Sequence, residues 1–128
     1  MPANLTPTCG KTLWAIAEGY IPGSSSEAGR ALESHETACL LNAGDADAHV
    51  RITLYFKDRE PAGPYEVTVP ARRTLHLRFN DLRSPEPVPR DTDYSSVFVS
   101  DVPIVVQHTR LDSRKEALAL LSTVAFGQ

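Results

Sequence analysis

Strict alternation across residues 49–57 is the sequence feature that most constrains the fold of this chain. Polar or amphipathic residues separate the apolar ones, which are Val50, Ile52, Leu54 and Phe56. Successive side chains of a β-strand point to opposite faces, so this pattern predicts a strand with one buried face. The period of two returns at 73–79, and 65–69 resumes it after the turn-forming residues 58–64.

Further strands are predicted along the chain, separated by Gly-, Pro-, Asp- or Ser-rich connections: 12–18, 36–41, 94–100, 104–109 and 118–126. About eight strands in all indicate an all-β fold, a single-domain antiparallel β-sandwich of jelly-roll type. A chain of 128 residues and 14.0 kDa is long enough for one core. We therefore expect one domain over 1–128, with 1–10 as a loose N-terminal arm.

The C-terminal stretch carries two conflicting signals. Ser113 and Glu116 have the spacing of a capping box, and Leu118 with Leu121 fits a helical period. Residues 122–124, Ser-Thr-Val, favour a strand instead. Periodicity leaves both structures open at this point.

Charge and leader patterns limit the classes of function. Lys and Arg number 13 against 16 Asp and Glu, a net charge of -3, so the chain lacks the bulk positive field typical of nucleic-acid binding. The N-terminus has neither a basic nor an apolar leader region, and the apolar run at 104–106 is too short to cross a bilayer. We expect a cytoplasmic protein.

Enzyme and metal signatures are weak. The sequence has no Gly-x-Ser-x-Gly motif and no glycine-rich phosphate loop, so we expect a binding protein rather than an enzyme, with no cofactor. His35 and Cys39 would lie about 13 Å apart along a strand, too far to share one ion. Cys9 and Cys39 are too few and too distant for a disulfide scaffold. No metal site is predicted.

Polar faces of two predicted strands are a candidate binding surface. If these strands are neighbours, they form a mixed cationic and hydroxyl-bearing surface suited to an anionic or polyhydroxylated partner. The alternative is a solvated outer face. The residues concerned are His49, Arg51, Thr53 and Tyr55 on one strand, and Thr74, His76 and Arg78 on the other.

A second polar cluster gathers at predicted strand ends and would line a pocket if the sandwich stacks those ends together. Its members are Glu18, His35, Glu36, Asn80, Asp81, His108, Arg110 and Asp112. Alternatively, Arg110 and Asp112 pair with each other or with backbone groups and hold loops. For Trp14 we expect a core or subunit contact before ligand stacking.

Several uninterrupted segments of the sequence resemble the sensory rhodopsin transducer family, and the resemblance runs from about Cys9 to the C-terminus. They are residues 14–22, 34–37, 41–50, 58–65, 78–82 and 105–112, which include Ser-His-Glu-Thr and Arg-Phe-Asn-Asp-Leu. The resemblance implies a soluble β-sandwich like carbohydrate-binding modules, a homotetramer, and a strand at the C-terminus. It also implies docking on the cytoplasmic face of a retinal membrane protein and relay of its signal.

Three hypotheses about partners follow from the residues and the resemblance together. The first is a signalling adaptor for a membrane rhodopsin, and the second is a binding module for sugars or sugar-like anions. The third is a transcriptional regulator. It requires that five arginines of the protein converge into one basic patch that contacts DNA: Arg51, Arg72, Arg73, Arg78 and Arg83. The candidate ligand or partner residues are Trp14, Glu18, His35, Arg51, Tyr55, His76, Arg78, Asn80, His108 and Arg110.

Overall fold

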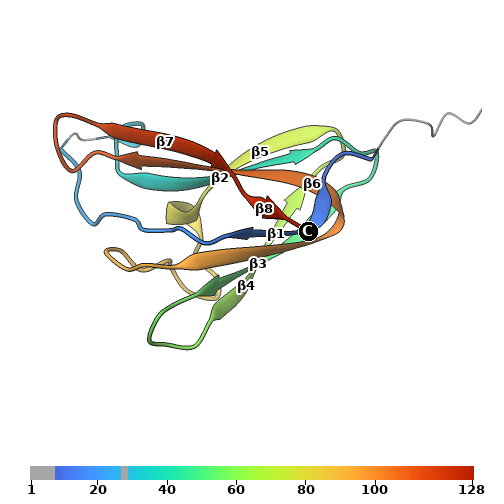
Figure 1. Ribbon diagram of the computed structural model, residues 1–128, viewed down its shortest axis with the longest axis horizontal. Coiled ribbons are helices and arrows are strands. Elements are labelled where there is room, and N and C mark those ends of the chain that lie inside the picture. The colour runs from blue at the N-terminus through green and yellow to red at the C-terminus, as the bar shows by residue number, and fades with distance from the viewer. Residues whose placement is uncertain (1–7, 27–28) are drawn as a thin grey trace, which may run out of the picture.

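The computed structural model describes residues 8–26 and 29–128, and within them the fold is all-β and antiparallel, as predicted (Figure 1). Most of the predicted N-terminal arm lies outside the described residues. A short 3-10 helix, η2, spans Phe79–Asp81. The strands are β1 Lys11–Ile16, β2 His35–Asn42, β3 Ala48–Tyr55, β4 Ala62–Val69, β5 Arg73–Arg78, β6 Ser95–Asp112, β7 Ala119–Val124 and β8 Phe126–Gly127.

Two packed layers share the long strand β6, which runs from one layer into the other (Figure 1). The β3 layer consists of β4, β3, the first part of β6, β1 and β8, in that order. The β2 layer consists of β5, β2, the second part of β6 and β7. The structure is therefore a β-sandwich, as predicted, while jelly-roll connectivity stays a prediction.

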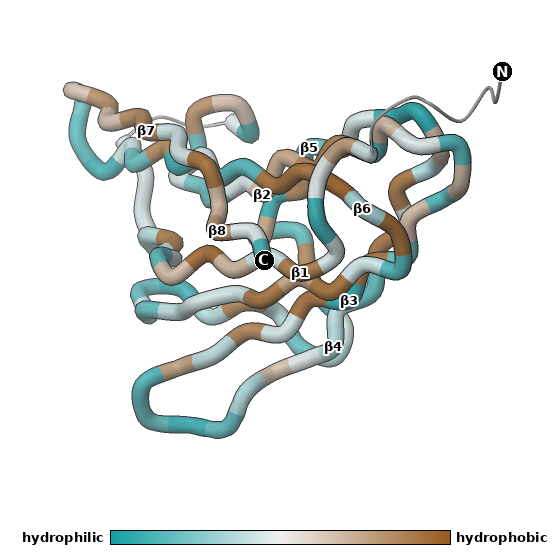
Figure 2. Tube along the Cα trace, turned by 45° about the vertical axis from the view of Figure 1, so that its right-hand side comes forward, coloured by the Kyte–Doolittle hydropathy of each residue, from teal (hydrophilic) through white to brown (hydrophobic). Residues whose placement is uncertain are grey.

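The core lies between the two layers. β3 alternates buried and exposed residues along its length, as the period of two predicts. Phe98 and Phe79 meet edge to face there with ring centroids 6.3 Å apart. In Figure 2, apolar segments of β1, β3 and β6 run through the middle of the molecule, while the turns at its ends are hydrophilic.

Strand β6 corrects the sequence prediction of separate strands at 94–100 and 104–109. It is one strand of 18 residues that passes through Pro103. Its ladder to β3 ends at Ser100, and its ladder to β2 begins at Val105, so Pro103 lies where the strand changes layers. Proline lacks a backbone N–H and is tolerated at this position, because no partner strand pairs with it.

The C-terminal stretch is extended rather than helical, in agreement with the strand signal. It is divided into β7, which pairs with β6, and the two-residue β8, which pairs with β1. Between them Ala125 is buried and its N–H donates to the Val106 carbonyl. Within residues 8–26 and 29–128, no helix has the length and apolarity needed to span a membrane.

Candidate functional site

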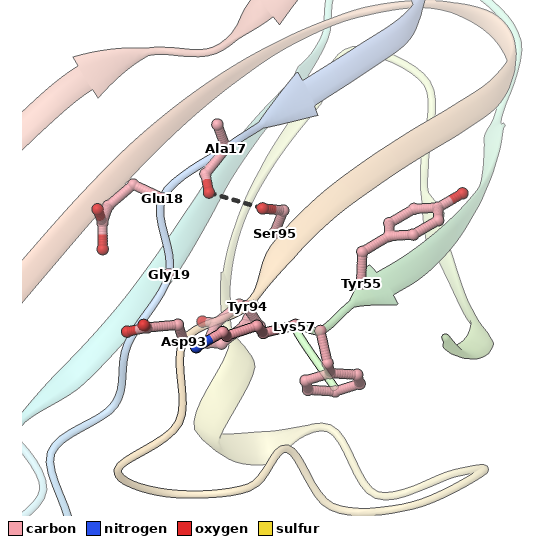
Figure 3. Close-up of a pocket in the computed structure, with 9 residues that line it drawn as sticks. Ala17, Glu18, Gly19, Tyr55, Lys57, Asp93, Tyr94 and Ser95 are labelled. Carbon is pink, nitrogen blue, oxygen red and sulfur yellow. Dashed lines mark hydrogen bonds between the residues drawn. The ribbon is translucent and has the colours of Figure 1, made fainter. Parts of the chain in front are cut away.

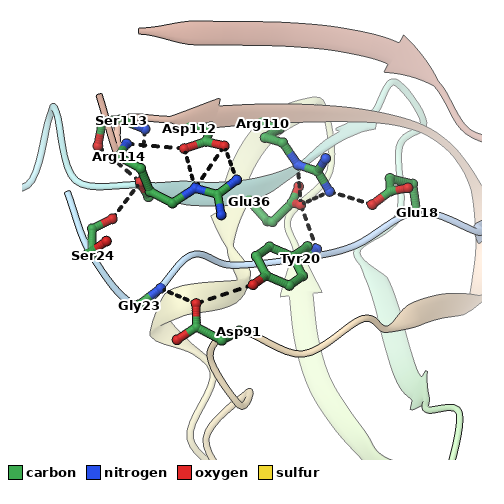
Figure 4. Close-up of polar contacts among 11 residues, drawn as sticks. Glu18, Tyr20, Gly23, Ser24, Glu36, Asp91, Arg110, Asp112, Ser113 and Arg114 are labelled. Atoms are coloured by element: carbon green, nitrogen blue, oxygen red, sulfur yellow. Dashed lines mark hydrogen bonds and ion pairs between the residues drawn. The ribbon is translucent and has the colours of Figure 1, made fainter. Parts of the chain in front are cut away.

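A buried carboxylate, that of Glu36, is the centre of the polar cluster in Figure 4. Glu36 is the second residue of β2 and has no exposed surface. Its Oε1 accepts hydrogen bonds from the Tyr20 backbone N–H at 2.8 Å and from Arg110 Nε at 2.7 Å. Its Oε2 accepts another from His108 Nε2. The β2–β6 register places Glu36 directly opposite Arg110, so strand pairing itself brings these partners together.

The Arg110 guanidinium connects this buried carboxylate to the surface (Figure 4). Its Nη2 lies 2.7 Å from Glu36 Oε1 and 2.6 Å from Glu18 Oε2, and the Glu18 side chain is 62% exposed. Burial opposes the charge on Arg110, but the hydrogen bonds from both carboxylates outweigh it and raise the pKa of Arg110. The predicted Arg110–Asp112 pair is not formed, because Asp112 pairs instead with Arg114 at 2.6 Å.

Asn80 fastens the helical turn η2 to the start of β2. Its Oδ1 accepts the Glu36 N–H at 3.3 Å, and its Nδ2 donates to the Ser34 carbonyl at 3.0 Å. His35 faces away from the cluster, since it alternates with Glu36 along the strand, and its Nδ1 donates to the Glu33 carbonyl at 2.7 Å. Of the predicted pocket residues, the structure joins Glu18, Glu36, Asn80, His108 and Arg110 in this cluster.

Two buried polar atoms beside the cluster have no hydrogen-bond partner among the described residues, His108 Nδ1 and Tyr94 Oη. His108 Nε2 faces the Glu36 carboxylate and is therefore the donor in that hydrogen bond, and Nδ1 is the ring nitrogen without a partner. Burial raises the pKa of Tyr94, and the nearby Glu36 charge raises it further. Tyr94 is therefore a neutral hydroxyl.

Replacing Tyr94 by Phe removes a buried hydroxyl that no described group satisfies. The Phe79 ring, 5.4 Å away between centroids, keeps its contact. We expect the free energy of unfolding to stay unchanged or rise by about 1 kcal/mol in urea denaturation. In the matched variant Tyr65→Phe, which loses a 2.8 Å bond to the Glu86 carbonyl, it should fall by about 1 kcal/mol. A larger loss for Tyr94→Phe than for Tyr65→Phe would contradict this assignment.

A cavity of about 430 Å³ opens next to the cluster, at the end of the sandwich (Figure 3). It lies where the chain leaves β1 and β3 and where β6 begins, and Glu18 belongs both to its wall and to the Arg110 pair. Its lining includes Tyr55, the last residue of β3, Lys57 shortly after it, and Asp93 with Tyr94 just before β6. Aromatic, hydroxyl and charged groups together suit a small polar ligand.

The prediction that the two polar strands share one surface is wrong. β3 pairs with β4 and β6, whereas β5 pairs with β2 in the other layer. Arg51 and Tyr55 therefore lie on a different outer face from His76 and Arg78. Arg51 is likewise separated from the other arginines of the predicted DNA patch. A period of two shows which residues share a face of one strand, but it does not choose that strand's neighbour.

On the outer face of the β3 layer, His49 pairs with Asp101. Its Nδ1 lies 2.7 Å from Asp101 Oδ2, and its backbone N–H donates to Oδ1 at 2.8 Å. The side-chain hydrogen bond raises the pKa of His49 above its ordinary 6.5. The backbone hydrogen bond, followed by the side-chain one, lowers the pKa of Asp101 below 3.8. Both groups thus favour their charged forms.

We expect proton NMR titration to give His49 a pKa above 6.5, and Asp101→Asn to bring it back toward that value. Because the folded pKa is raised, the His49 contribution to stability is fully present below pH 6.5 and is lost as pH rises through the folded pKa. The Asp101 contribution is present above pH 3.8 and is lost as pH falls through its folded pKa. If the pKa of His49 is the same in Asp101→Asn as in the wild type, the pairing is contradicted.

Trp14 and Cys39 have contacts that belong to the fold and not to the cluster or the cavity. Trp14 is buried, and its Nε1 donates to the Ile104 carbonyl at 2.9 Å and to the Lys11 carbonyl at 3.0 Å. Cys39 is half-buried beside Thr109 on the outer face of the β2 layer. In the part of the chain that the structure describes, no group of three His, Cys, Asp or Glu side chains is arranged to hold a metal ion.

Sequence reasoning missed Lys57, Asp93 and Tyr94, which line the cavity, and Tyr20, whose backbone N–H enters the cluster. Asp91, with φ of 53°, was also missed, and it accepts hydrogen bonds from Gly23 N–H at 2.9 Å and Tyr20 Oη at 3.4 Å (Figure 4). In the structure these residues lie just outside the strands, and the alternation that predicts a strand around Lys57 or Tyr94 indicates a buried face and not a binding residue. Only the tertiary structure shows that they line the cavity or contact the cluster.

The fold and the site define a small antiparallel β-sandwich with a buried carboxylate–guanidinium cluster joined to an open cavity at one end. Residues 9–127 match the family described as Anabaena sensory rhodopsin transducer, and the chain belongs to that family. The predicted resemblance is therefore confirmed. No protein among the curated sequences matches the chain.

Two solved structures are similar to this chain over most of its length. The Anabaena sensory rhodopsin transducer is 60% identical, with a TM-score of 0.71, over 81% of this chain and all of its own. The Thermotoga maritima protein 1070 is 36% identical, with a TM-score of 0.82, over 93% of this chain and 96% of its own.

Proposed function

We propose that this protein is a cytoplasmic adaptor that docks on the cytoplasmic face of a microbial sensory rhodopsin and relays its signal. Membership of the transducer family, with 60% identity to the Anabaena sensory rhodopsin transducer, carries the proposal. The role is one of binding rather than catalysis.

Charge supports an end-on approach to the receptor. Asp58 and Asp93 line a second pocket that shares Lys57 and Asp93 with the cavity, and Glu60 is exposed two residues after Asp58. Lys57 and Arg59 lie among these carboxylates, which outnumber them, and we call the three carboxylates the acidic end. Cytoplasmic loops of membrane proteins are enriched in Lys and Arg, and complementary charges accelerate association. The acidic end therefore fits the loops of a rhodopsin.

Calorimetry against a cognate rhodopsin in neutral-lipid nanodiscs tests this docking. We expect binding that weakens about tenfold when Asp58, Glu60 and Asp93 are replaced by the matching amides. The variant Glu66→Gln, an exposed carboxylate on another face, is the control and should bind like the wild type. Absence of wild-type binding would contradict the proposed function, and equal weakening by the control would contradict the acidic end.

We propose that the homotetramer implied by the family uses the outer face of the β3 layer. Val99 is 50% exposed and Phe126 67% exposed, and the β1–β6 register places Leu13 directly opposite Val99. Exposed apolar groups that cluster in this way are typical of interaction sites. Light scattering should show a lower mass for Phe126→Asp than for the wild type, and no change for Leu118→Asp. A monomeric wild type would contradict the tetramer.

A second candidate function is small-molecule binding in the cavity of about 430 Å³. Sugars and sugar-like anions suit its aromatic and hydroxyl groups. A thermal-shift screen should then find a ligand that raises the melting temperature of the wild type and not that of Tyr55→Ala. If no sugar or metabolite raises it, this function is excluded.

A further inference from the structure

Strand β7 is an edge strand of the β2 layer that the described part of the chain leaves uncovered. It pairs with β6 on one side, and no described strand pairs with its other side. All six of its side chains are exposed, on both faces of the sheet. They include Leu120 at 71%, Leu121 at 44% and Val124 at 64%. β7 is therefore an apolar strand with one open edge (Figure 1).

The β6–β7 register shows which backbone groups of β7 are free. The Ala125 N–H donates to the Val106 carbonyl, one position beyond the end of the ladder at Val124. Hydrogen-bonded and non-hydrogen-bonded pairs alternate along an antiparallel ladder. The odd-numbered residues of β7 therefore bond to β6, and the even-numbered ones, Leu120, Ser122 and Val124, point their N–H groups and carbonyls outward. These groups are available to a further strand.

The other long edge strands within residues 8–26 and 29–128, β4 and β5, carry features that block strand addition. β4 holds Pro64 and Glu66, and its ladder to β3 contains a register shift. β5 begins with Arg73 and ends with Arg78. Proline, charge and irregularity on an edge hinder its pairing with another chain. The six residues of β7 include no charge and no proline, so its edge stays open to a partner.

β7 begins at the same end of the molecule as the acidic end. In Figure 1 the turn between β6 and β7, the turn between β3 and β4, and the loop before β6 all lie at the left. The turn before β7 also contacts that end. The Arg114 guanidinium lies 5.7 Å from the centroid of the Tyr20 ring, and Tyr20 forms an isolated β-bridge with Asp93. A partner segment at the acidic end is therefore next to the open edge of β7.

We propose that an extended cytoplasmic segment of the receptor adds to β7 as a further strand, an inference that rests on the proposed docking on a rhodopsin. The outward backbone groups of Leu120, Ser122 and Val124 supply the hydrogen bonds. Leu120 and Leu121 point to opposite faces, so the segment that fits is uncharged and carries apolar side chains. The position of β7 beside the acidic end favours the receptor over a second copy of this chain.

Proline at position 122 tests strand addition. Ser122→Pro removes an outward N–H and keeps the ladder to β6, because the bonds of that ladder belong to the neighbouring residues. Ser122→Ala is the matched control, since it removes only the hydroxyl, which lies 3.2 Å from the Thr109 hydroxyl, and keeps the N–H. In calorimetry against a cognate rhodopsin in neutral-lipid nanodiscs, Ser122→Pro should bind at least about tenfold more weakly than the wild type, and Ser122→Ala within about twofold of it.

Hydrogen exchange on the wild-type protein guards against a folding defect in Ser122→Pro. The amides of Leu120 and Val124 should exchange at least about tenfold more slowly in the rhodopsin complex than in the free protein. Wild-type binding without this protection, or equal binding by Ser122→Pro, would overturn the inference and leave the docking intact. Absence of wild-type binding would overturn both. A lower light-scattering mass for Ser122→Pro than for the wild type would show that a second copy occupies the edge, which also overturns the inference.

Discussion

Glu36→Gln should lower the free energy of unfolding by about 3 kcal/mol, because it removes a charge on which buried groups depend. In the wild type the Glu36 carboxylate, with no exposed surface, accepts hydrogen bonds from Arg110, His108 and the Tyr20 backbone. The amide keeps the shape but leaves the Arg110 guanidinium without its buried counter-charge. Urea denaturation at fixed protein concentration measures the change.

The matched control is Glu18→Gln, which alters a carboxylate on the same guanidinium. Glu18 is 62% exposed, so water replaces the lost interaction, and we expect a loss under about 1 kcal/mol. Similar losses for the two variants would show that burial does not decide the strength of this cluster. A Glu36→Gln protein as stable as the wild type would show that the carboxylate is not needed for folding.

Phe98→Ala should cost about 3–5 kcal/mol in the same measurement, because it empties the centre of the sandwich. Phe98 is fully buried on β6, where it pairs with Trp14 on one side and Ile52 on the other, and its ring meets Phe79. Few neighbours can move to fill the space between two hydrogen-bonded layers. The cost is therefore both lost apolar burial and a cavity.

Tyr55→Ala is the control for Phe98→Ala, since it truncates an aromatic residue on the neighbouring strand β3. Tyr55 is 44% exposed on the outer face, and we expect a loss within about 1 kcal/mol. A small loss for Phe98→Ala, or an equally large one for Tyr55→Ala, would contradict the assignment of inner and outer faces on this layer.

Part of the candidate site could be predicted because strand ends collect polar residues. Glu18, Asn80, His108 and Arg110 were expected to meet and do so around Glu36. Their partners were not predictable, since Arg110 pairs across the β2–β6 ladder and not with Asp112, two positions away. Tyr94 begins the predicted strand 94–100 and Asp93 precedes it, but alternation indicates only which side chains are buried, so neither was recognised as lining a cavity.

The period of two in the sequence was by itself sufficient to determine which side chains of β3 and β5 face inward and outward, since successive residues of a strand point to opposite sides. The sequence segments that the chain shares with the transducer family were sufficient to place the chain in that family. Only the tertiary structure decided that β3 and β5 belong to different layers and that β6 crosses between them. Strand neighbours are chosen by non-local packing and hydrogen bonding, which a local pattern does not contain.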